Sequence, residues 1–184
     1  SGLIKQENLR MKKQVENVLN MSKLERNEVK LFLKDTDVRN LIKRTTESFG
    51  LIVAQRNGTL TQEFNTEKYQ FKIDEFHISN ALVNLLDNAN KYSPEAPEIT
   101  VKTRNEGNWY VIEISDKGMG METDNKLRIF EKFFREETGN IHNVKGQGLG
   151  LSYVKKIIEL HKGLIIVDST KNYGSTFTIK LPMS

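Results

Sequence analysis

A predicted helix from Ile78 to Ala89 is the feature of this sequence that most restricts its fold. Its apolar residues recur at helical spacing and cover much of the helix surface, so the helix must be buried on more than one side. Pro94 and Pro97 end the helix. A helix of this kind needs other elements around it, which predicts a layered domain with one core.

Strand patterns around this helix predict the second layer. Alternating apolar residues indicate strands at Ile99–Arg104 and Trp109–Ser115, and residues 105–108 suit a hairpin loop between them. Further strands are predicted at residues 29–33, 60–64, 69–73, 164–168 and 176–181. Further helices are predicted at residues 38–45, behind the capping residues Asp35, Thr36 and Asp37, and from about residue 148 to 161. The expected fold class is α/β of the α+β type: a two-layer sandwich with helices on one face of a mixed, mostly antiparallel sheet.

The N-terminal segment predicts one long helix that precedes this sandwich. Residues 1–27 contain no proline and, after Gly2, no glycine. Apolar residues recur at roughly helical spacing, at Ile4, Met11, Val15, Val18 and Leu24. Such a helix cannot bury its apolar stripe alone, so it should pack against a helix of this chain or of another. An ordinary surface helix docked on its own domain is the alternative.

Composition excludes several classes of protein. With 37% hydrophobic and 28% charged residues, the 184-residue chain has the balance of a soluble globular protein. No apolar run approaches the roughly 18–20 residues that a membrane span needs. The absence of cysteine excludes disulfides and cysteine-ligated zinc, and is compatible with a reducing cytoplasm. The net charge of +4 is spread along the chain rather than gathered on one basic face, so no nucleic-acid partner is expected.

The first of four patches with chemical potential lies on the buried helix and at its end. Asn84, Asn88 and Lys91 fall on one face of the helix. Amide oxygens are hard ligands that suit a Mg²⁺ ion shared with phosphates, and an ammonium suits the phosphates themselves. Tyr92 offers a ring for stacking on a base. A polar helix edge facing water is the alternative for this patch alone.

The second patch, Asp116-Lys117-Gly118-Met119-Gly120, follows directly after a predicted strand. The Asp116 carboxylate could accept a hydrogen bond from an exocyclic amine such as N6 of adenine. Gly118 and Gly120 would let the backbone approach a flat ring, because they lack Cβ atoms. An ordinary turn has the same composition.

The third patch, residues 129–135, places three aromatic side chains in a glycine-punctuated, polar stretch. The aromatic residues could anchor a mobile flap from which Arg135 reaches a phosphate, and a short core helix is the alternative.

The fourth patch, residues 146–151, precedes a predicted helix. Its glycines would expose backbone N–H groups to an anion at the helix N-terminus. The patch lacks the Gly-Lys-Ser/Thr of a P-loop, and no strand leads into it as in a Rossmann fold.

In this order, the four patches resemble the N box, first glycine box, F box and second glycine box of bacterial sensor histidine kinases. Residues 173–177 (Tyr-Gly-Ser-Thr-Phe) resemble the third glycine box of that family. The likeness covers residues 29–184, the ATP-binding catalytic domain, whose fold the family shares with gyrase, Hsp90 and MutL. Residues 1–28 are similar to the second helix of the family's dimerisation domain, which carries the histidine phosphotransfer site.

The resemblance implies a site for ATP and Mg²⁺. Asn84 would hold the metal, and Asn88 would lie near metal and nucleotide. The resemblance further implies nucleotide contacts from Lys91, Tyr92, Asp116, Gly118, Gly120, Arg135, Gly146, Gln147, Gly148, Leu149, Gly150, Leu151 and Thr176. Residues 123–144 would form a lid that closes over the nucleotide. Gln147 departs from the small or hydroxyl residues that are common at its position in the family.

The resemblance also implies a protein-histidine kinase that passes phosphate from Mg-ATP to a histidine and then to a response-regulator aspartate. His77, His142 and His161 do not match the acceptor position, so the chain should bind ATP without phosphorylating itself. The expected partners are a receiver domain and a second copy of the full-length protein. The expected location is the cytoplasmic side of a protein anchored in the cell membrane.

Three other functions are open to a chain with this fold. Gyrase, Hsp90 and MutL hydrolyse ATP with a glutamate four residues before the asparagine that corresponds to Asn88. That position is Asn84 here, and a neutral amide cannot take a proton from water. A non-catalytic binding or pairing module is the second possibility. A serine kinase of the anti-sigma type is the third, and the long leading helix speaks against it.

Overall fold

The computed structural model describes residues 2–132, 134 and 148–184. These residues form, in chain order, α1 (Gly2–Glu25), β1 (Lys34–Asp37), α2 (Val38–Ala54), β2 (Thr59–Asn65), β3 (Gln70–Ile73), α3 (Glu75–Lys91), β4 (Glu98–Glu106), β5 (Trp109–Asp116), the 3-10 turn η1 (Thr123–Asn125), α4 (Gly150–Leu160), β6 (Leu164–Thr170) and β7 (Gly174–Pro182).

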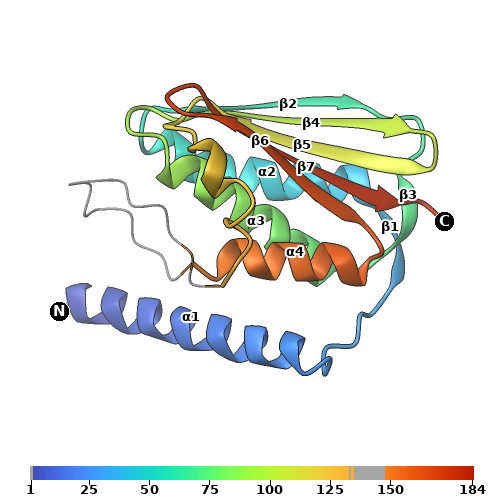
Figure 1. The fold of residues 1–184 in the computed structure, drawn as a ribbon, viewed down its shortest axis with the longest axis horizontal. Helices are drawn as coiled ribbons and strands as arrows, with labels where there is room; N and C mark the ends of the chain where they lie inside the picture. The colour runs from blue at the N-terminus through green and yellow to red at the C-terminus, as the bar shows by residue number, and fades with distance from the viewer. Residues whose placement is uncertain (1, 133, 135–147) are drawn as a thin grey trace.

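The main sheet has five strands in the order β2-β4-β5-β7-β6. Strands β2 and β4 are parallel, and the other three neighbouring pairs are antiparallel. Strands β1 and β3 form a separate two-stranded sheet. Helices α2, α3 and α4 form one layer against the main sheet, with α1 outside them beside α4 (Figure 1). The predicted two-layer sandwich with a mixed, mostly antiparallel sheet is confirmed.

Helix α3 lies at the centre of the core, as its apolar surface predicts. Ile78, Leu82, Leu85 and Leu86 are each no more than 2% exposed. The buried carboxylate of Asp74 caps the helix by accepting the N–H of its third residue at 3.0 Å. The orientation of α3 is therefore fixed by burial along its length and by a cap at its N-terminus.

The predicted strand at residues 29–33 is wrong, and the strand lies instead at Lys34–Asp37. The N–H of Phe32 donates to the Asp74 carboxylate at 2.8 Å, not to a neighbouring strand. Strand β3 has four residues, and all of them pair with β1. Of the three predicted capping residues, only Asp37 caps α2, accepting Asn40 N–H at 2.8 Å.

Other boundaries also differ from the sequence prediction. Helix α4 begins at Gly150 rather than near Gly148. His77, predicted to precede the central helix, lies in its first turn because α3 begins at Glu75. The hairpin between β4 and β5 is tighter than predicted: only Gly107 and Asn108 connect the strands, and Gly107 adopts φ +56°.

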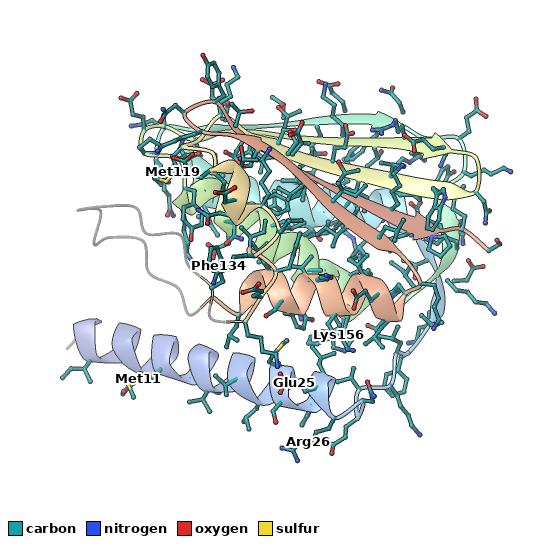
Figure 2. All side chains as sticks on the ribbon, viewed as in Figure 1. Met11, Glu25, Arg26, Met119, Phe134 and Lys156 are labelled. Carbon is teal, nitrogen blue, oxygen red and sulfur yellow. The ribbon has the colours of Figure 1, made fainter. Side chains whose placement is uncertain are left out.

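Helix α1 is attached to the rest of the protein near its C-terminal end. Met21 and Leu24 are buried in the common core, and Ser152 Oγ of α4 lies 4.0 Å from the Met21 sulfur. Met11 lies on the side of α1 that faces away from the helical layer (Figure 2). Large apolar side chains that α1 leaves exposed are those of Ile4, Met11, Val15, Val18 and Leu19. Among the described residues, no helix has the length and apolarity needed to cross a membrane.

Candidate nucleotide-binding site

Asn84 connects the buried helix α3 with the start of α4. Its side-chain amide donates to Asn80 O at 2.8 Å, which directs the side-chain oxygen to the other side. A Cβ atom built on Gly150 would lie 2.9 Å from that oxygen. The structure therefore brings the first and fourth patches together, with an amide oxygen facing the glycine segment.

Lys91 and Asn88 are engaged within α3. The Lys91 ammonium lies 2.6 Å from an Asp87 carboxylate oxygen, and both side chains are partly exposed. Asn88 O accepts the N–H of Tyr92, the residue that ends the helix, at 3.0 Å. A surface ion pair of this kind is worth less than about 1 kcal/mol. Lys91 can therefore separate from Asp87 at small cost.

Asp116 ends β5 and is half-buried. Its carboxylate accepts Gly118 N–H at 2.8 Å and also the N–H of Ser175. Burial raises the pKa of Asp116 from 3.8 to about 6, and these two hydrogen bonds act in the opposite direction. A partly desolvated carboxyl of this kind needs a further donor, which the exocyclic amine of adenine could provide.

Gly118 lies against the end of α3. A Cβ atom there would come within 2.5 Å of Tyr92 O and 2.7 Å of Asp116 Oδ1. Met119 N–H donates to the same Tyr92 carbonyl at 3.0 Å. The first and second patches therefore adjoin. Gly120 has φ +61° and would also clash with backbone if it carried a side chain.

The N-terminus of α4 presents backbone N–H groups without a side-chain cap. Leu149, the N-cap residue, makes no side-chain capping bond, and its own side chain is buried. Gly148 adopts φ +70° and turns the chain into the helix. The first N–H groups of a helix have no partner within it and attract anions. Leu151 packs on the core from the first turn. Gly146 and Gln147 lie outside the described residues.

The third patch packs partly on the core. Ile129 is buried, and the Phe130 ring meets Phe177 of β7 edge-on at 6.4 Å. Arg128 lies over the Phe134 ring at 4.6 Å. Figure 2 shows Phe134 at the same end of the molecule as Met119 of the second patch. Arg135 and one of the three aromatic residues, Phe133, lie outside the described residues. Thr176 bonds the Ser115 hydroxyl at 2.9 Å across β5 and β7.

Both described histidines are hydrogen-bonded to other residues of the chain. His161 is 8% exposed; its Nδ1 bonds Ile157 O at 2.8 Å, and its Nε2 accepts Asp74 N–H at 3.0 Å. Burial lowers the pKa of His161, which fits this neutral ring. His77 Nδ1 lies 2.9 Å from the Tyr153 hydroxyl. His142 lies outside the described residues.

Arg56 supports the site, and sequence analysis did not find it. Its guanidinium donates to Ser93 O at 2.6 Å and Glu95 O at 3.2 Å, and also bonds Asn90 O. These carbonyls lie in the last turn of α3 and just after it, where a cation also meets the negative end of the helix dipole. An arginine in a turn after α2 carries no sequence signal of such a contact.

We expect Arg56→Met to lower the free energy of unfolding by about 2–3 kcal/mol, because three carbonyl acceptors lose a charged donor. Chemical denaturation monitored by circular dichroism measures this loss. The matched control is Arg44→Met, which removes a surface ion pair to Glu75 at 2.7 Å and should cost less than about 1 kcal/mol. Equal losses from the two variants would contradict the capping role of Arg56.

A separate groove lies at the other end of α3. It has a volume of about 890 Å³ and is formed by α2, the first half of α3 and residues 30–34. None of the described nucleotide-site residues lines it. Among the described residues, no three His, Cys, Asp or Glu side chains gather as a metal site. A divalent cation at Asn84 would therefore take most of its ligands from phosphates and water.

Known proteins resemble this chain in sequence and in fold. A family model described as Histidine kinase-, DNA gyrase B-, and HSP90-like ATPase matches residues 73–184. The chain is 42% identical over 185 residues to Sensor protein RprX of Bacteroides fragilis (strain YCH46), an alignment that covers 100% of this chain and 36% of RprX. The chain therefore spans about a third of the length of that relative.

Two solved structures share the fold. ShkA full-length in complex with AMPPNP matches with a TM-score of 0.82 and 22% identity, covering 92% of this chain and 35% of ShkA. Histidine kinase ThkA in complex with response regulator protein TrrA matches with a TM-score of 0.77 and 23% identity, covering 99% of this chain and 50% of the matched chain. The family model spans more than half of the chain, from the last residue of β3 to Ser184. On that ground, the chain belongs to the histidine kinase-, DNA gyrase B-, and HSP90-like ATPase family.

Proposed function

We propose that this chain binds Mg-ATP as the catalytic domain of a sensor histidine kinase. In the full-length protein, it would deliver the γ-phosphate to a histidine outside this chain. The observation that carries the proposal is the position of Asn84. Its side-chain oxygen faces Gly150, where a phosphate-bound cation would lie, and it occupies the position at which ATP-hydrolysing relatives need a carboxylate base.

The described residues would contact the adenine at one end of the site and the phosphates at the other. Asp116 and the Gly118–Gly120 loop would take the adenine, with the Tyr92 ring packed on the base. The N–H groups of Gly150 and Leu151 would accept the phosphates at the start of α4. Lys91 and Arg135 would add positive charge. The predicted contacts of Asn88, Gly146, Gln147, Gly148, Leu149 and Thr176 stay predictions.

Asn84 fits a Mg²⁺ ion bound together with ATP. Its amide nitrogen is held by Asn80 O, so its oxygen is fixed in a ligating direction. The ion, when bound, would neutralise charge on the phosphates. Phosphoryl transfer depends mainly on position and charge stabilisation, and this chain supplies both for the nucleotide.

The proposed partners are a receiver domain and a second copy of the full-length protein. Residues 1–28 would be part of the dimerisation domain, and residues 29–184 the catalytic domain. The exposed apolar side chains of α1, such as Met11 and Val15, support a packing role for that helix. A complex of ThkA with a response regulator supports the receiver partner. Anchoring of the full-length protein in a membrane stays a prediction.

We expect the chain to bind Mg-ATP without steady hydrolysis and without becoming phosphorylated, because Asn84 cannot activate water and neither described histidine matches an acceptor. Isothermal titration calorimetry, phosphate release and labelling with γ-³²P-ATP measure the three outcomes. Asn84→Ala should weaken Mg-ATP binding about tenfold or more, with a smaller effect when the metal is chelated. Asn65→Ala, an exposed asparagine on β2, is the matched control. Steady hydrolysis that disappears in Asn84→Ala would instead favour an ATP hydrolase.

A further inference from the structure

One buried hydroxyl, that of Ser169 in β6, joins three segments around the candidate adenine site. Ser169 is 4% exposed. Its Oγ accepts Met121 N–H at 2.9 Å, donates to Gly174 O at 3.0 Å and lies 2.8 Å from Ser175 Oγ. Because its single proton goes to Gly174 O, the Ser175 hydroxyl must be the donor in the third bond. The full hydrogen-bonding capacity of Ser169 is therefore used.

The turn between β6 and β7 supports the glycine loop that follows β5. Asn172 N–H donates to Met119 O at 2.6 Å. The backbone of Gly120 approaches Thr170 so closely that a Cβ atom would lie 2.0 Å from its carbonyl oxygen. The Met121 bond to Ser169 is the next contact along the same loop. Three successive residues of the loop thus rest on the β6–β7 turn.

Ser169 also bonds to β7, the strand that donates one of the two backbone hydrogen bonds to the Asp116 carboxylate. Asp116 and Ser175 are paired across β5 and β7, and the Ser175 N–H bonds the carboxylate. The second donor to that carboxylate is Gly118 N–H, which belongs to the glycine loop. One donor therefore comes from the loop and the other from β7. Ser169 is bonded to both segments.

We infer that Ser169 is a positioning residue for base recognition. Its hydroxyl holds the glycine loop against the start of β7 and so fixes the direction of the Asp116 carboxylate. The inference rests on the proposed function, because it concerns the adenine end of the same site. The phosphate end, at Asn84 and the start of α4, involves none of the Ser169 bonds.

The test compares binding of Mg-ATP and Mg-GTP to the whole chain by calorimetry. In Ser169→Ala, ATP affinity should fall about tenfold, while GTP affinity should change less than about twofold. Guanine presents a carbonyl where adenine presents an amine, so GTP donates no hydrogen bond to Asp116 at this position and loses none when the direction of the carboxylate changes. Ser169→Thr keeps a hydroxyl and should recover most of the preference for ATP. In the nucleotide-free protein, the Met121 amide should exchange with deuterium faster in Ser169→Ala.

The matched control is Thr46→Val on α2. Thr46 is 2% exposed and its hydroxyl donates to Ile42 O at 2.7 Å, so the variant loses a buried hydrogen bond far from the glycine loop. The ratio of ATP to GTP affinity should not change in this variant. Unchanged ATP affinity in Ser169→Ala, or a parallel loss for ATP and GTP, would overturn the inference and leave the proposed function standing. If the wild-type chain binds no Mg-ATP, the proposed function fails, and the inference fails with it.

Discussion

Replacing Asp116 with alanine is expected to weaken ATP binding by about 100-fold near pH 7, because the base loses a charge-assisted hydrogen bond. The N–H groups of Gly118 and Ser175, which the carboxylate accepts, also lose their acceptor. Calorimetric titration of Mg-ATP measures the loss. Glu113→Ala on the same strand removes an ion pair to Arg104 and should leave ATP affinity within about twofold. Comparable losses in the two variants would remove Asp116 from the site.

The pH dependence of ATP affinity provides a second test of Asp116. Its pKa of about 6 in the nucleotide-free protein means that ATP affinity should fall as the pH is lowered through that value. Asp116→Asn cannot titrate, so the ratio of wild-type to variant affinity should decrease on acidification, whatever the phosphates of ATP do. For the stability of the nucleotide-free protein, the raised pKa predicts the opposite pH dependence. The wild type loses stability relative to Asp116→Asn as the pH rises from about 4 to about 6.

We expect Gly174→Ala to lower the free energy of unfolding by about 3–4 kcal/mol, the largest stability loss predicted here. Gly174 has φ +116°, a conformation that strongly favours glycine. An added Cβ atom would also lie 1.9 Å from the carbonyl oxygen of Asp116. That oxygen is a backbone atom of β5, which is paired with β7, so it cannot move away easily. Thermal and chemical denaturation measure the loss, and ATP binding should weaken with it.

Alanine substitutions at two other glycines serve as controls, because their added Cβ atoms make no contact. Gly107→Ala keeps the strain of a positive φ, +56°, but the added Cβ atom meets nothing within 4 Å. Its expected cost is about 1 kcal/mol. Gly50→Ala lies in α2 and also meets nothing, so it should stabilise the protein by about 0.5–1 kcal/mol. A Gly174→Ala variant as stable as Gly107→Ala would show that the Asp116 backbone can move away.

The order of helices and strands could be predicted because each element with a buried face shows the matching period. Residues 29–33 show where this method fails. The segment has the apolar pattern of a strand, yet Phe32 is 77% and Leu33 52% exposed. Hydropathy records the tendency of a segment to be buried and does not identify a pairing strand. All four residues of β3 pair with Lys34–Asp37, so β3 has no residue left to pair with residues 29–33.

Side-chain chemistry alone marked two residues of the candidate site in the sequence. Asn84 and Asp116 stood out because few residue types ligate a cation or accept an exocyclic amine at such positions. Arg56 and Ser169 act instead through bonds to distant backbone groups. Arg56 bonds a carbonyl 37 residues away, and Ser169 bonds an N–H 48 residues away. Contacts of this kind arise only when the chain has folded, so no local sequence pattern predicts them.

The attachment of α1 sets the free energy needed to detach this helix from the rest of the protein. Met21 and Leu24 are buried at the end of that helix, and Phe32 N–H is held by the buried Asp74 carboxylate. Breaking these contacts would cost about 5 kcal/mol, so about one molecule in several thousand would be detached at rest. Any change that moves α1 away from the rest of the chain would have to supply work of this size. The docked end of the helix therefore holds α1 in place against any change that supplies less free energy than this.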